Sequence, residues 1–304
     1  MRTVYLGSSR FAVDVLGALA ASPHAPALVV TPPDRPRGRG RRTAPPPAAV
    51  AARDLGLPLL QAESVNDPDA VAAIEEVAPE AIGVCEFGQL IREPLLSRHV
   101  MLNVHPSLLP RWRGAAPIER ALMAGDTLTG VTIFRLEEGF DSGPVALSRA
   151  EPILPDDTRG TLIERLSALG AELLIDAFDR AEAGTLELLP QPAEGVTYAE
   201  KIDPAERRLD PLRPAAELER VVRALNPGIG TYVEFEDGQR LGVEEARPVE
   251  DPVEPGAVVV DGGRMLIGCG AGALELLRVR RAGGRSMQVA DYLRGHRPAA
   301  RLAA

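Results

Sequence analysis

The spacing of hydrophobic and polar positions changes along the chain and predicts its elements. In the first third, segments with apolar residues every three to four positions lie between short runs that are apolar throughout. The predicted helices are residues 11–21, 48–55 and 67–77, and the predicted strands are residues 3–6, 27–30, 57–61, 81–85 and 101–104. Strands apolar on both faces that alternate with helices indicate a parallel, doubly wound sheet.

The same pattern continues to a long helical segment. Apolar segments at 130–136 and 145–149 predict two further strands, and an amphipathic segment at 159–183 predicts a helix. Gly184 follows directly, in the position that favours a helix C-cap. The first part of the chain is therefore expected to form one α/β domain.

The pattern changes near residue 189. A polar, proline-containing stretch precedes one helical segment at 215–224 and then short alternating segments with glycine turns. Such short strands are typical of a small antiparallel barrel. We predict an α/β domain with a doubly wound, mostly parallel sheet at residues 1–189, a linker at 190–207, and a small OB-like β-barrel domain at 208–304.

Composition limits the class of protein. A length of 304 residues suits two domains. The chain lacks the run of about 18 apolar residues that a membrane span needs, so no membrane association is expected. Cys85 and Cys269 lie far apart, in different predicted domains, and make no disulfide framework. We expect a cytoplasmic protein.

Positive charge is concentrated in two segments of an acidic chain. The net charge is −9, yet residues 35–42 hold five arginines and no acid. Residues 262–304 hold eight arginines against Glu275 and Asp291, a local net charge of +6, so the other 261 residues carry −15. Two basic segments on an acidic body favour local contact with phosphates. Solvated loops in an arginine-biased composition remain the alternative.

Candidate chemistry begins at the end of one predicted strand. Asn103 and His105 are two positions apart, so both side chains emerge on the same face of the strand. Pro106 cannot donate a ladder hydrogen bond and is expected to end the strand, which leaves His105 at a carboxyl end, where open α/β sheets bind ligands. Asp141 follows 36 residues later in a glycine-flanked loop.

These three residue types suit transfer of an acyl group to an amine. A histidine near neutral pKa can take up the proton of the attacking amine. An amide can donate to the oxyanion, a contact worth about 100- to 1000-fold in rate. A carboxylate can orient the imidazole and raise its pKa. Each residue alone has an ordinary structural interpretation, as do Trp112 as a packing residue and Thr132 as a strand residue.

The sequence gives little support to a metal site. It contains no His-Glu-x-x-His and no paired Cys-x-x-Cys, and Cys85-Glu86 near His105 is a weak basis for zinc. A nucleophilic Cys85 is less favoured than a small buried hydrophobic residue at a strand end. We expect no metal.

With these residues in place, the chain resembles the methionyl-tRNA formyltransferases, a branch of the folate-dependent formyltransferases. Asn103-Val104-His105, Ser107-Leu108-Leu109-Pro110 and the spacing to Asp141 are shared with the wider family. The resemblance implies 10-formyltetrahydrofolate as formyl donor and Asn103, His105 and Asp141 as catalytic residues. The folate contacts that it implies are Glu86, Phe87, Gly88, Leu90, Ser107, Leu108, Leu109, Pro110 and Gly139.

Three segments resemble the tRNA-specific branch. They are the tail Arg111-Trp112-Arg113-Gly114-Ala115-Ala116-Pro117, the arginine-rich loop from Pro33 to Arg41, and Thr197-Tyr198-Ala199-Glu200-Lys201-Ile202. The resemblance implies initiator methionyl-tRNA as partner, a monomer, and a tRNA-binding barrel domain. The implied tRNA contacts are Arg35, Arg37, Arg39, Arg41, Arg42, Arg280, Arg281 and Arg285, with Arg39 matching the most important arginine of the loop.

The chain also departs from the family pattern. Ser8-Ser9-Arg10 replaces Thr-Pro-Asp, Glu86-Phe87-Gly88 replaces Ala-Tyr-Gly, and Pro106 replaces a glycine. The Asn226-Pro227 pair lacks the tryptophan that usually follows. None of these changes removes a catalytic residue.

Two other functions stay open at the level of sequence. One is formylation of a small amine such as an amino sugar nucleotide, and the other is a non-catalytic RNA-binding protein on the same scaffold. The arginine-rich loop and the barrel weigh against the first, and the intact catalytic set weighs against the second.

Overall fold

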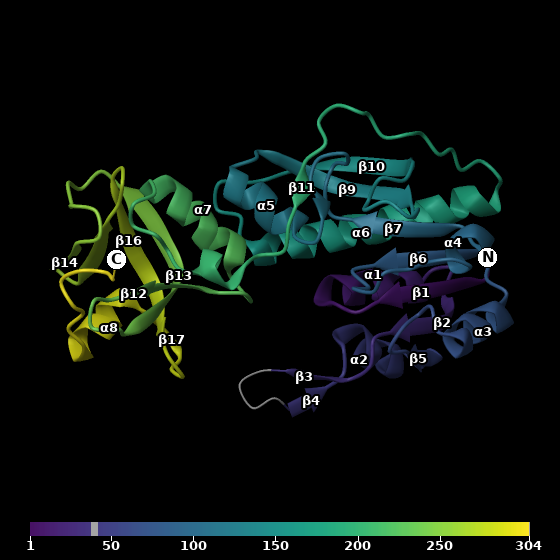
Figure 1. Ribbon diagram of the computed structural model, residues 1–304, viewed down its shortest axis with the longest axis horizontal. Coiled ribbons are helices and arrows are strands. Elements are labelled where there is room, and N and C mark those ends of the chain that lie inside the picture. Colours follow the sequence, from purple (N-terminus) through teal and green to yellow (C-terminus); the bar gives the residue numbers. More distant parts are fainter. Residues whose placement is uncertain (38–41, 304) are drawn as a thin grey trace. The chain divides into compact units, whose positions relative to one another are not determined.

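The computed structural model describes residues 1–37 and 42–303 and contains two compact units (Figure 1). Unit 1 consists of Met1–Pro117, Leu128–Pro152 and Ile163–Ala199, and unit 2 consists of Ile118–Thr127, Ile153–Leu162 and Glu200–Ala304. Residues 189–199 thus belong to unit 1.

Unit 1 is built on a seven-stranded sheet in the order β10-β9-β7-β6-β1-β2-β5 (Figure 1). Its five strands from β7 to β5 pair in parallel, and β9 and β10 are added antiparallel. The prediction of a mostly parallel, doubly wound sheet is confirmed. The strands are β1 (Thr3–Gly7), β2 (Pro26–Thr31), β5 (Leu59–Gln61), β6 (Ala81–Cys85), β7 (Met101–His105), β9 (Leu128–Arg135) and β10 (Val145–Pro152).

Helices cover both faces of this sheet. On one face, Gly83 of β6 lies against Leu174 and Phe178 of α6, and Gly170 of α6 lies against Val104 of β7. On the other face, strand residues Val4, Leu6, Ile82 and Val84 share a core with Ile74 of α3 and Leu95 and Leu96 of α4. The helices are α1 (Arg10–Ala20), α2 (Pro47–Asp54), α3 (Pro68–Val77), α4 (Leu95–Arg98) and α6 (Arg159–Glu182).

This packing decides which way the candidate residues face. Because Val104 faces α6 and neighbouring strand residues point to opposite faces, Asn103 and His105 face away from α6. The strand also ends at His105, as the position of Pro106 predicts.

The chain order in the sheet reverses between β1 and β6, which makes a topological switch point. At that point the hydroxyl of Ser8, directly after β1, donates to the carbonyl of Glu86, directly after β6, at 2.5 Å. Crevices at such switch points are the usual ligand sites of open α/β sheets.

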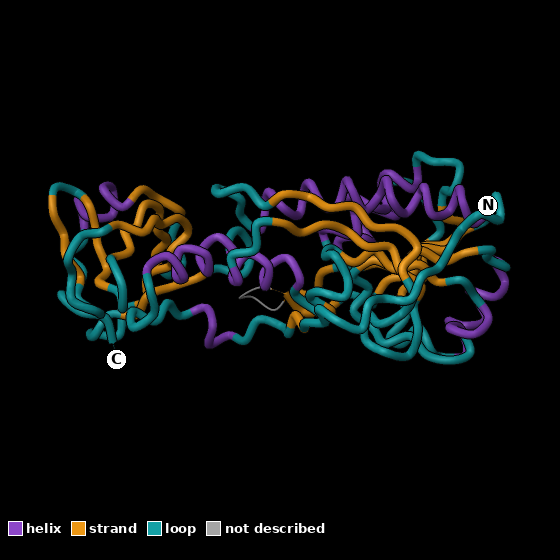
Figure 2. Tube along the Cα trace, turned by 90° about the horizontal axis from the view of Figure 1, so that it is seen from above, coloured by secondary structure: helices purple, strands orange, loops and turns teal. Residues whose placement is uncertain are grey.

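Unit 2 contains a six-stranded antiparallel sheet, whose strands are orange in Figure 2. Its last residues join the two sheet edges, because Leu302 bridges to Phe235 after β12 and Arg301 bridges to Ala257 before β14. A closed sheet of this kind agrees with the predicted small barrel. The strands are β12 (Thr231–Glu234), β13 (Arg240–Val249), β14 (Val258–Asp261), β15 (Arg264–Gly268), β16 (Ala273–Arg281) and β17 (Ser286–Gln288).

The barrel core is apolar and is sealed by a helix. Leu218, Val221, Val222 and Leu225 of α7 (Ala215–Leu225) belong to the same core as the inward-facing strand residues. α7 has the acidic residue Glu217 in its first turn and the basic residue Arg223 in its last, which suits the helix dipole. The other elements are α8 (Val289–Gly295), α5 (Pro117–Ala124), the 3-10 helix Pro204–Arg207, β8 (Arg113–Gly114) and β11 (Tyr198–Ala199).

Several elements differ from the prediction. The arginine-rich segment, predicted as a loop, pairs as the hairpin of β3 (Arg35–Arg37) and β4 (Arg42–Ala44). The strands predicted for the barrel are short, whereas β13 has ten residues, because register shifts near Glu245 let it follow β16 past the polar positions. Both features depend on backbone pairing between strands, so the alternation of apolar and polar side chains does not reveal them.

Two further expectations concern the chain as a whole. Within the described ranges, no helix combines the length and apolarity needed to cross a membrane. Cys85 and Cys269 are both buried and free, as expected from their separation.

Candidate active site

His105 is held at the end of β7 by a backbone contact. It is 4% exposed, and its Nε2 lies 2.8 Å from the carbonyl oxygen of Trp112. A carbonyl oxygen only accepts hydrogen bonds, so Nε2 carries the proton and donates it. In the neutral ring Nδ1 then holds a lone pair. The ring also makes a T-shaped contact with Phe134, with ring centroids 6.2 Å apart.

The free Nδ1 of His105 faces a carboxylate. Asp141 Oδ2 lies 3.7 Å from it, which is longer than a hydrogen bond but close enough for the charge to act on the ring. The same oxygen accepts a 2.7 Å hydrogen bond from the backbone N–H of Gly114. The structure therefore brings together His105 and Asp141, as the sequence predicts.

The ionisation of His105 follows from this environment. Burial lowers its pKa below the ordinary value of 6.5, while the charge of Asp141 and the hydrogen bond to Trp112 act in the opposite direction. We expect a neutral, Nε2-protonated ring near neutral pH, which becomes charged only as the pH falls below 6.5. A ¹⁵N NMR titration, with the four histidines assigned by single substitutions, measures both properties. The Asp141→Asn variant should titrate at still lower pH, and a ring protonated at Nδ1 would contradict this assignment.

The loop that carries Asp141 is strained and closely packed. Asp141 has φ +46°, a left-handed conformation that costs a non-glycine residue about 1–3 kcal/mol. Gly143 brings the loop back to β9 so closely that a Cβ there would lie 1.9 Å from the carbonyl oxygen of Arg135. Glu86 and Trp112 also have positive φ values, so strained residues gather around this site.

Asn103 offers a free amide. It lies half-buried on the same face of β7 as His105. Within residues 1–37 and 42–303, its side chain has no hydrogen-bond partner. An amide in such a position can donate to a ligand oxygen.

The segment after β7 is fixed by its own hydrogen bonds. The buried Ser107 hydroxyl donates to the carbonyl of Arg111 at 2.6 Å, and the hydroxyl of Thr132 donates to the Ser107 carbonyl at 2.7 Å and accepts from Leu109 N–H at 3.1 Å. Thr132 is thus more than an ordinary strand residue, because it sets the path of the loop. Leu108, Leu109 and Pro110 are half-buried there.

The other predicted folate contacts lie in two loops. Glu86, Gly88 and Leu90 follow β6 and are exposed, Leu90 by 52%. Phe87 is only 3% exposed and packs in the core with Ile82 and Val84 of β6, so its ring is not exposed to a ligand. Gly139 is exposed in the Asp141 loop.

The arginines predicted to contact tRNA fall into different environments. In unit 1, Arg35 pairs with Glu63 at 2.6 Å, Arg37 and Arg42 are register partners in the hairpin, and Arg39 and Arg41 lie outside the described residues. In unit 2, Arg280 pairs with Glu244 at 2.6 Å. Arg281 and Arg285 are exposed on the β16–β17 hairpin, and neither pairs with an acidic residue in the described part of the chain.

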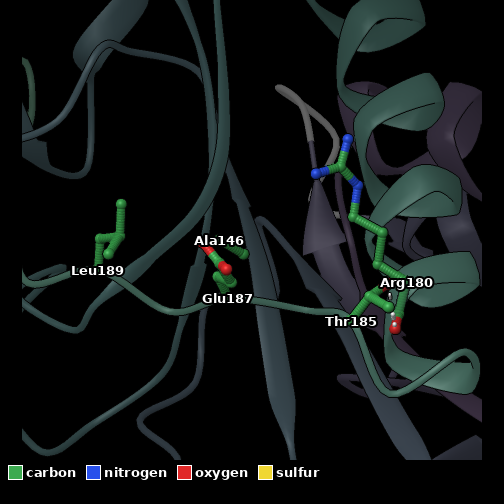
Figure 3. A pocket seen from close by; sticks show the side chains of 5 residues that line it. All are labelled: Ala146, Arg180, Thr185, Glu187 and Leu189. Carbon is green, nitrogen blue, oxygen red and sulfur yellow. Dashed lines mark hydrogen bonds between the residues drawn. The ribbon is translucent and has the colours of Figure 1, made fainter.

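Two other features share no residue with the His105–Asp141 pair. A shallow hollow of about 380 Å³ lies between α6 and β10 and is lined by Ala146, Arg180, Thr185, Glu187 and Leu189 (Figure 3). Metal-binding atoms of His24, Asp179 and Glu182 lie within 4.8 Å of one another. Both carboxylates already have partners, because Asp179 bonds His24 Nε2 and Glu182 bonds the amino group of Met1, each at 2.8 Å.

Sequence reasoning missed the residues that hold the pair in place. Gln191 and Thr197 lie in or beside the predicted linker, yet Gln191 bonds the Asp141 loop and Thr197 accepts from the N–H of Trp112 at 2.8 Å. No local pattern marks Gln191, and Thr197 stands out only as the first residue of a family-like segment, because the partners of both residues lie 48–85 positions away. A buried imidazole, a carboxylate and a free amide at the carboxyl end of a doubly wound sheet define a site for acyl transfer.

Comparison with known proteins agrees with this class. The Formyl transferase family model matches residues 1–178, and the model for the Formyl transferase C-terminal domain matches residues 201–297. Methionyl-tRNA formyltransferase of Ruegeria pomeroyi is 43% identical over 297 residues, which covers 97% of each chain. That of Halorhodospira halophila is 45% identical over 302 residues, covering 97% of this chain and 96% of its own. The chain belongs to the formyl transferase family.

Solved structures share the fold. The methionyl-tRNA formyltransferase of Clostridium thermocellum superposes with a TM-score of 0.58 at 13% identity, covering 83% of this chain and 95% of its own. HypX of Aquifex aeolicus in complex with tetrahydrofolic acid gives a TM-score of 0.67 at 19% identity over 96% of this chain. This chain spans about half the length of HypX, 47% of that chain.

Proposed function

We propose that this chain transfers the formyl group of 10-formyltetrahydrofolate to the α-amino group of initiator methionyl-tRNA. The observation that carries the proposal is an end-to-end match, at 41–45% identity, to proteins named methionyl-tRNA formyltransferase. In this proposal residues 1–189 form the catalytic domain, 190–207 a linker and 208–304 a tRNA-binding domain. The protein acts as a cytoplasmic monomer.

His105 is the proton acceptor in the proposed mechanism. Its Nε2 is occupied by the Trp112 carbonyl, so Nδ1 is the atom that takes a proton from the attacking amine. The low pKa keeps Nδ1 free near neutral pH. Asp141, 3.7 Å away, stabilises the imidazolium that results, and the Gly114 N–H keeps that carboxylate in place.

Asn103 stabilises the negative charge that develops on the formyl oxygen. The formyl oxygen becomes negative as the amine adds to the formyl carbon, and a fixed amide donor offsets that charge. Asn103 is suited to this because its amide has no partner among the described residues. An amide already satisfied within the protein would first have to break a hydrogen bond.

The residues present fit a folate co-substrate, which supplies the formyl carbon as the electrophile when bound. The half-buried side chains Leu108, Leu109 and Pro110 and the exposed Leu90 offer apolar surface for a ring system. We propose that these residues, together with Glu86, Phe87, Gly88, Gly139 and the buried Ser107, form the folate site.

A direct assay tests the function. Labelled formyl is supplied on 10-formyltetrahydrofolate, with charged initiator methionyl-tRNA as acceptor and elongator methionyl-tRNA in parallel. The expected result is strong labelling of the initiator and much weaker labelling of the elongator. No labelling by folded protein that still binds tRNA would reject the proposal.

The barrel arginines give a separate prediction. Because Arg281 and Arg285 pair with no described acidic residue, the double Ala variant should raise KM for methionyl-tRNA about tenfold and reduce the salt dependence of binding by about two charges. The KM for folate should not change. Arg294→Ala is the control, because Arg294 is already paired with Asp291 in the same basic segment. Equal effects of the two variants would contradict the assignment.

A further inference from the structure

One side chain makes four hydrogen bonds beside the proposed catalytic pair. Gln191 Nε2 donates to the carbonyl oxygens of Asp141 and Gly143, each at 2.8 Å. Gln191 Oε1 accepts from Arg113 Nε at 3.1 Å and from Arg113 Nη2 at 2.7 Å. Every donor and both lone pairs of the amide are used. The orientation of the amide is also fixed, because a flipped amide would face acceptors with its oxygen and donors with its nitrogen.

These four bonds join the two segments that place the Asp141 carboxylate. One segment is the backbone of Asp141 itself, and the other is β8, in which Arg113 precedes the Gly114 whose N–H binds Asp141 Oδ2. Gln191 therefore contacts both the backbone that carries the Asp141 side chain and the residue next to Gly114, whose N–H bonds that side chain. Without it, the two segments would lose this link and keep the bond from Gly114 N–H to Asp141 Oδ2 with less support.

The backbone of Asp141 needs such support. A left-handed conformation at a non-glycine residue persists only where surrounding contacts over-determine it. The Gln191 amide supplies two of these contacts, because it donates to the carbonyl oxygens of Asp141 and Gly143.

The rest of the segment is fixed to the same loop. β11 pairs in parallel with β8, the Thr197 hydroxyl accepts from Trp112 N–H at 2.8 Å, and Arg113 N–H donates to the Thr197 carbonyl at 2.9 Å. The Trp112 carbonyl is the oxygen that binds His105 Nε2. The residues after α6 thus hold both members of the pair.

We propose that Gln191 is a positioning residue for formyl transfer, which holds the Asp141 carboxylate at its working distance from His105. The proposal rests on the proposed function in that it assigns a role in that reaction. The residue touches neither substrate; it acts through the Asp141 backbone and through Arg113.

The first test is kinetic. Gln191→Ala should lower kcat about 10- to 100-fold, since a misplacement of about 1 Å can cost about 100-fold, with both KM values within about twofold. In a background of Asp141→Asn, the same substitution should cost little more, because the carboxylate it positions is already gone. Gln191→Met, which keeps the volume of the side chain, serves if the alanine variant does not fold. Gln239→Ala is the control, since that amide bonds Asp237 in an exposed turn of unit 2.

The second test does not depend on formyl transfer. Asp141 raises the pKa of His105, so loosening the carboxylate should move the NMR titration of His105 to lower pH in Gln191→Ala. A kcat within twofold of wild type, fully multiplicative effects with Asp141→Asn, or an unchanged His105 titration would overturn the positioning role. If the wild type transfers no formyl group, the proposed function fails, whereas the titration still decides whether Gln191 positions Asp141.

Discussion

The Asp141→Asn variant should lose formyl transfer by about three orders of magnitude in kcat while keeping its fold. Replacing a hydrogen-bonded carboxylate beside a catalytic imidazole by an amide costs about 10⁴-fold elsewhere, with the geometry intact, and the longer 3.7 Å contact here should cost somewhat less. Here the new side-chain oxygen can still accept from Gly114 N–H, so the loop keeps its anchor. What is lost is the negative charge 3.7 Å from His105 Nδ1, which stabilises the ring once it takes the proton. Stopped-flow or quenched transfer assays measure the effect.

A second histidine–aspartate pair supplies the control. Asp179 bonds the buried His24 at 2.8 Å, a shorter contact than that between Asp141 and His105. Asp179→Asn should leave kcat within about twofold, because this pair has no part in the proposed chemistry. Melting curves of both variants check the fold. A kcat for Asp141→Asn within tenfold of wild type would remove Asp141 from the mechanism.

The sequence was sufficient where structure depends on local spacing. The period-two positions of Asn103 and His105 place both side chains on one face, and Pro106 ends β7 directly after His105. The apolar runs likewise gave the strands of the parallel sheet, since burial on both faces leaves a continuous hydrophobic signal. The spacing to Asp141 alone predicts only a carboxylate in a later loop and not its distance from His105.

The sequence was not sufficient where backbone groups meet side chains from distant segments. The Trp112 carbonyl that fixes the His105 tautomer, and the Gly114 N–H that holds Asp141, are invisible to any side-chain pattern. Gln191 was expected in a polar linker, because polar residues near prolines are typical of one. Its four hydrogen bonds exist only once the chain beyond α6 returns to β8.

The position of His105 depends on its neighbours in a series of contacts. Gln191 and the pairing of β8 with β11 fix the two loops that carry Asp141 and Trp112. Within these loops, the Asp141 carboxylate is bonded by Gly114 N–H, and the Trp112 carbonyl accepts from the imidazole of His105. Asn103 is not part of this series of contacts, because its side chain has no hydrogen-bond partner among the described residues. Substitutions in the loops should therefore perturb His105, whereas a substitution of Asn103 should remove one interaction and leave the ring as it is.

Asn103→Ala should accordingly reduce kcat by about 100- to 1000-fold, the cost of removing one oxyanion donor, with little change in stability. Its amide has no hydrogen-bond partner within the described ranges, so truncation breaks nothing in the folded protein. Asn226 is the matched contrast, since its buried amide donates to the carbonyls of Val222 and Val243 at 2.9 and 3.2 Å. Asn226→Ala should instead lower the free energy of unfolding by about 1–3 kcal/mol, because it leaves those carbonyls without that donor. Denaturant melts and single-turnover transfer separate the two outcomes. If Asn103→Ala lowered stability and kept kcat, its amide would be a structural group, and the negative charge on the formyl oxygen would need another donor.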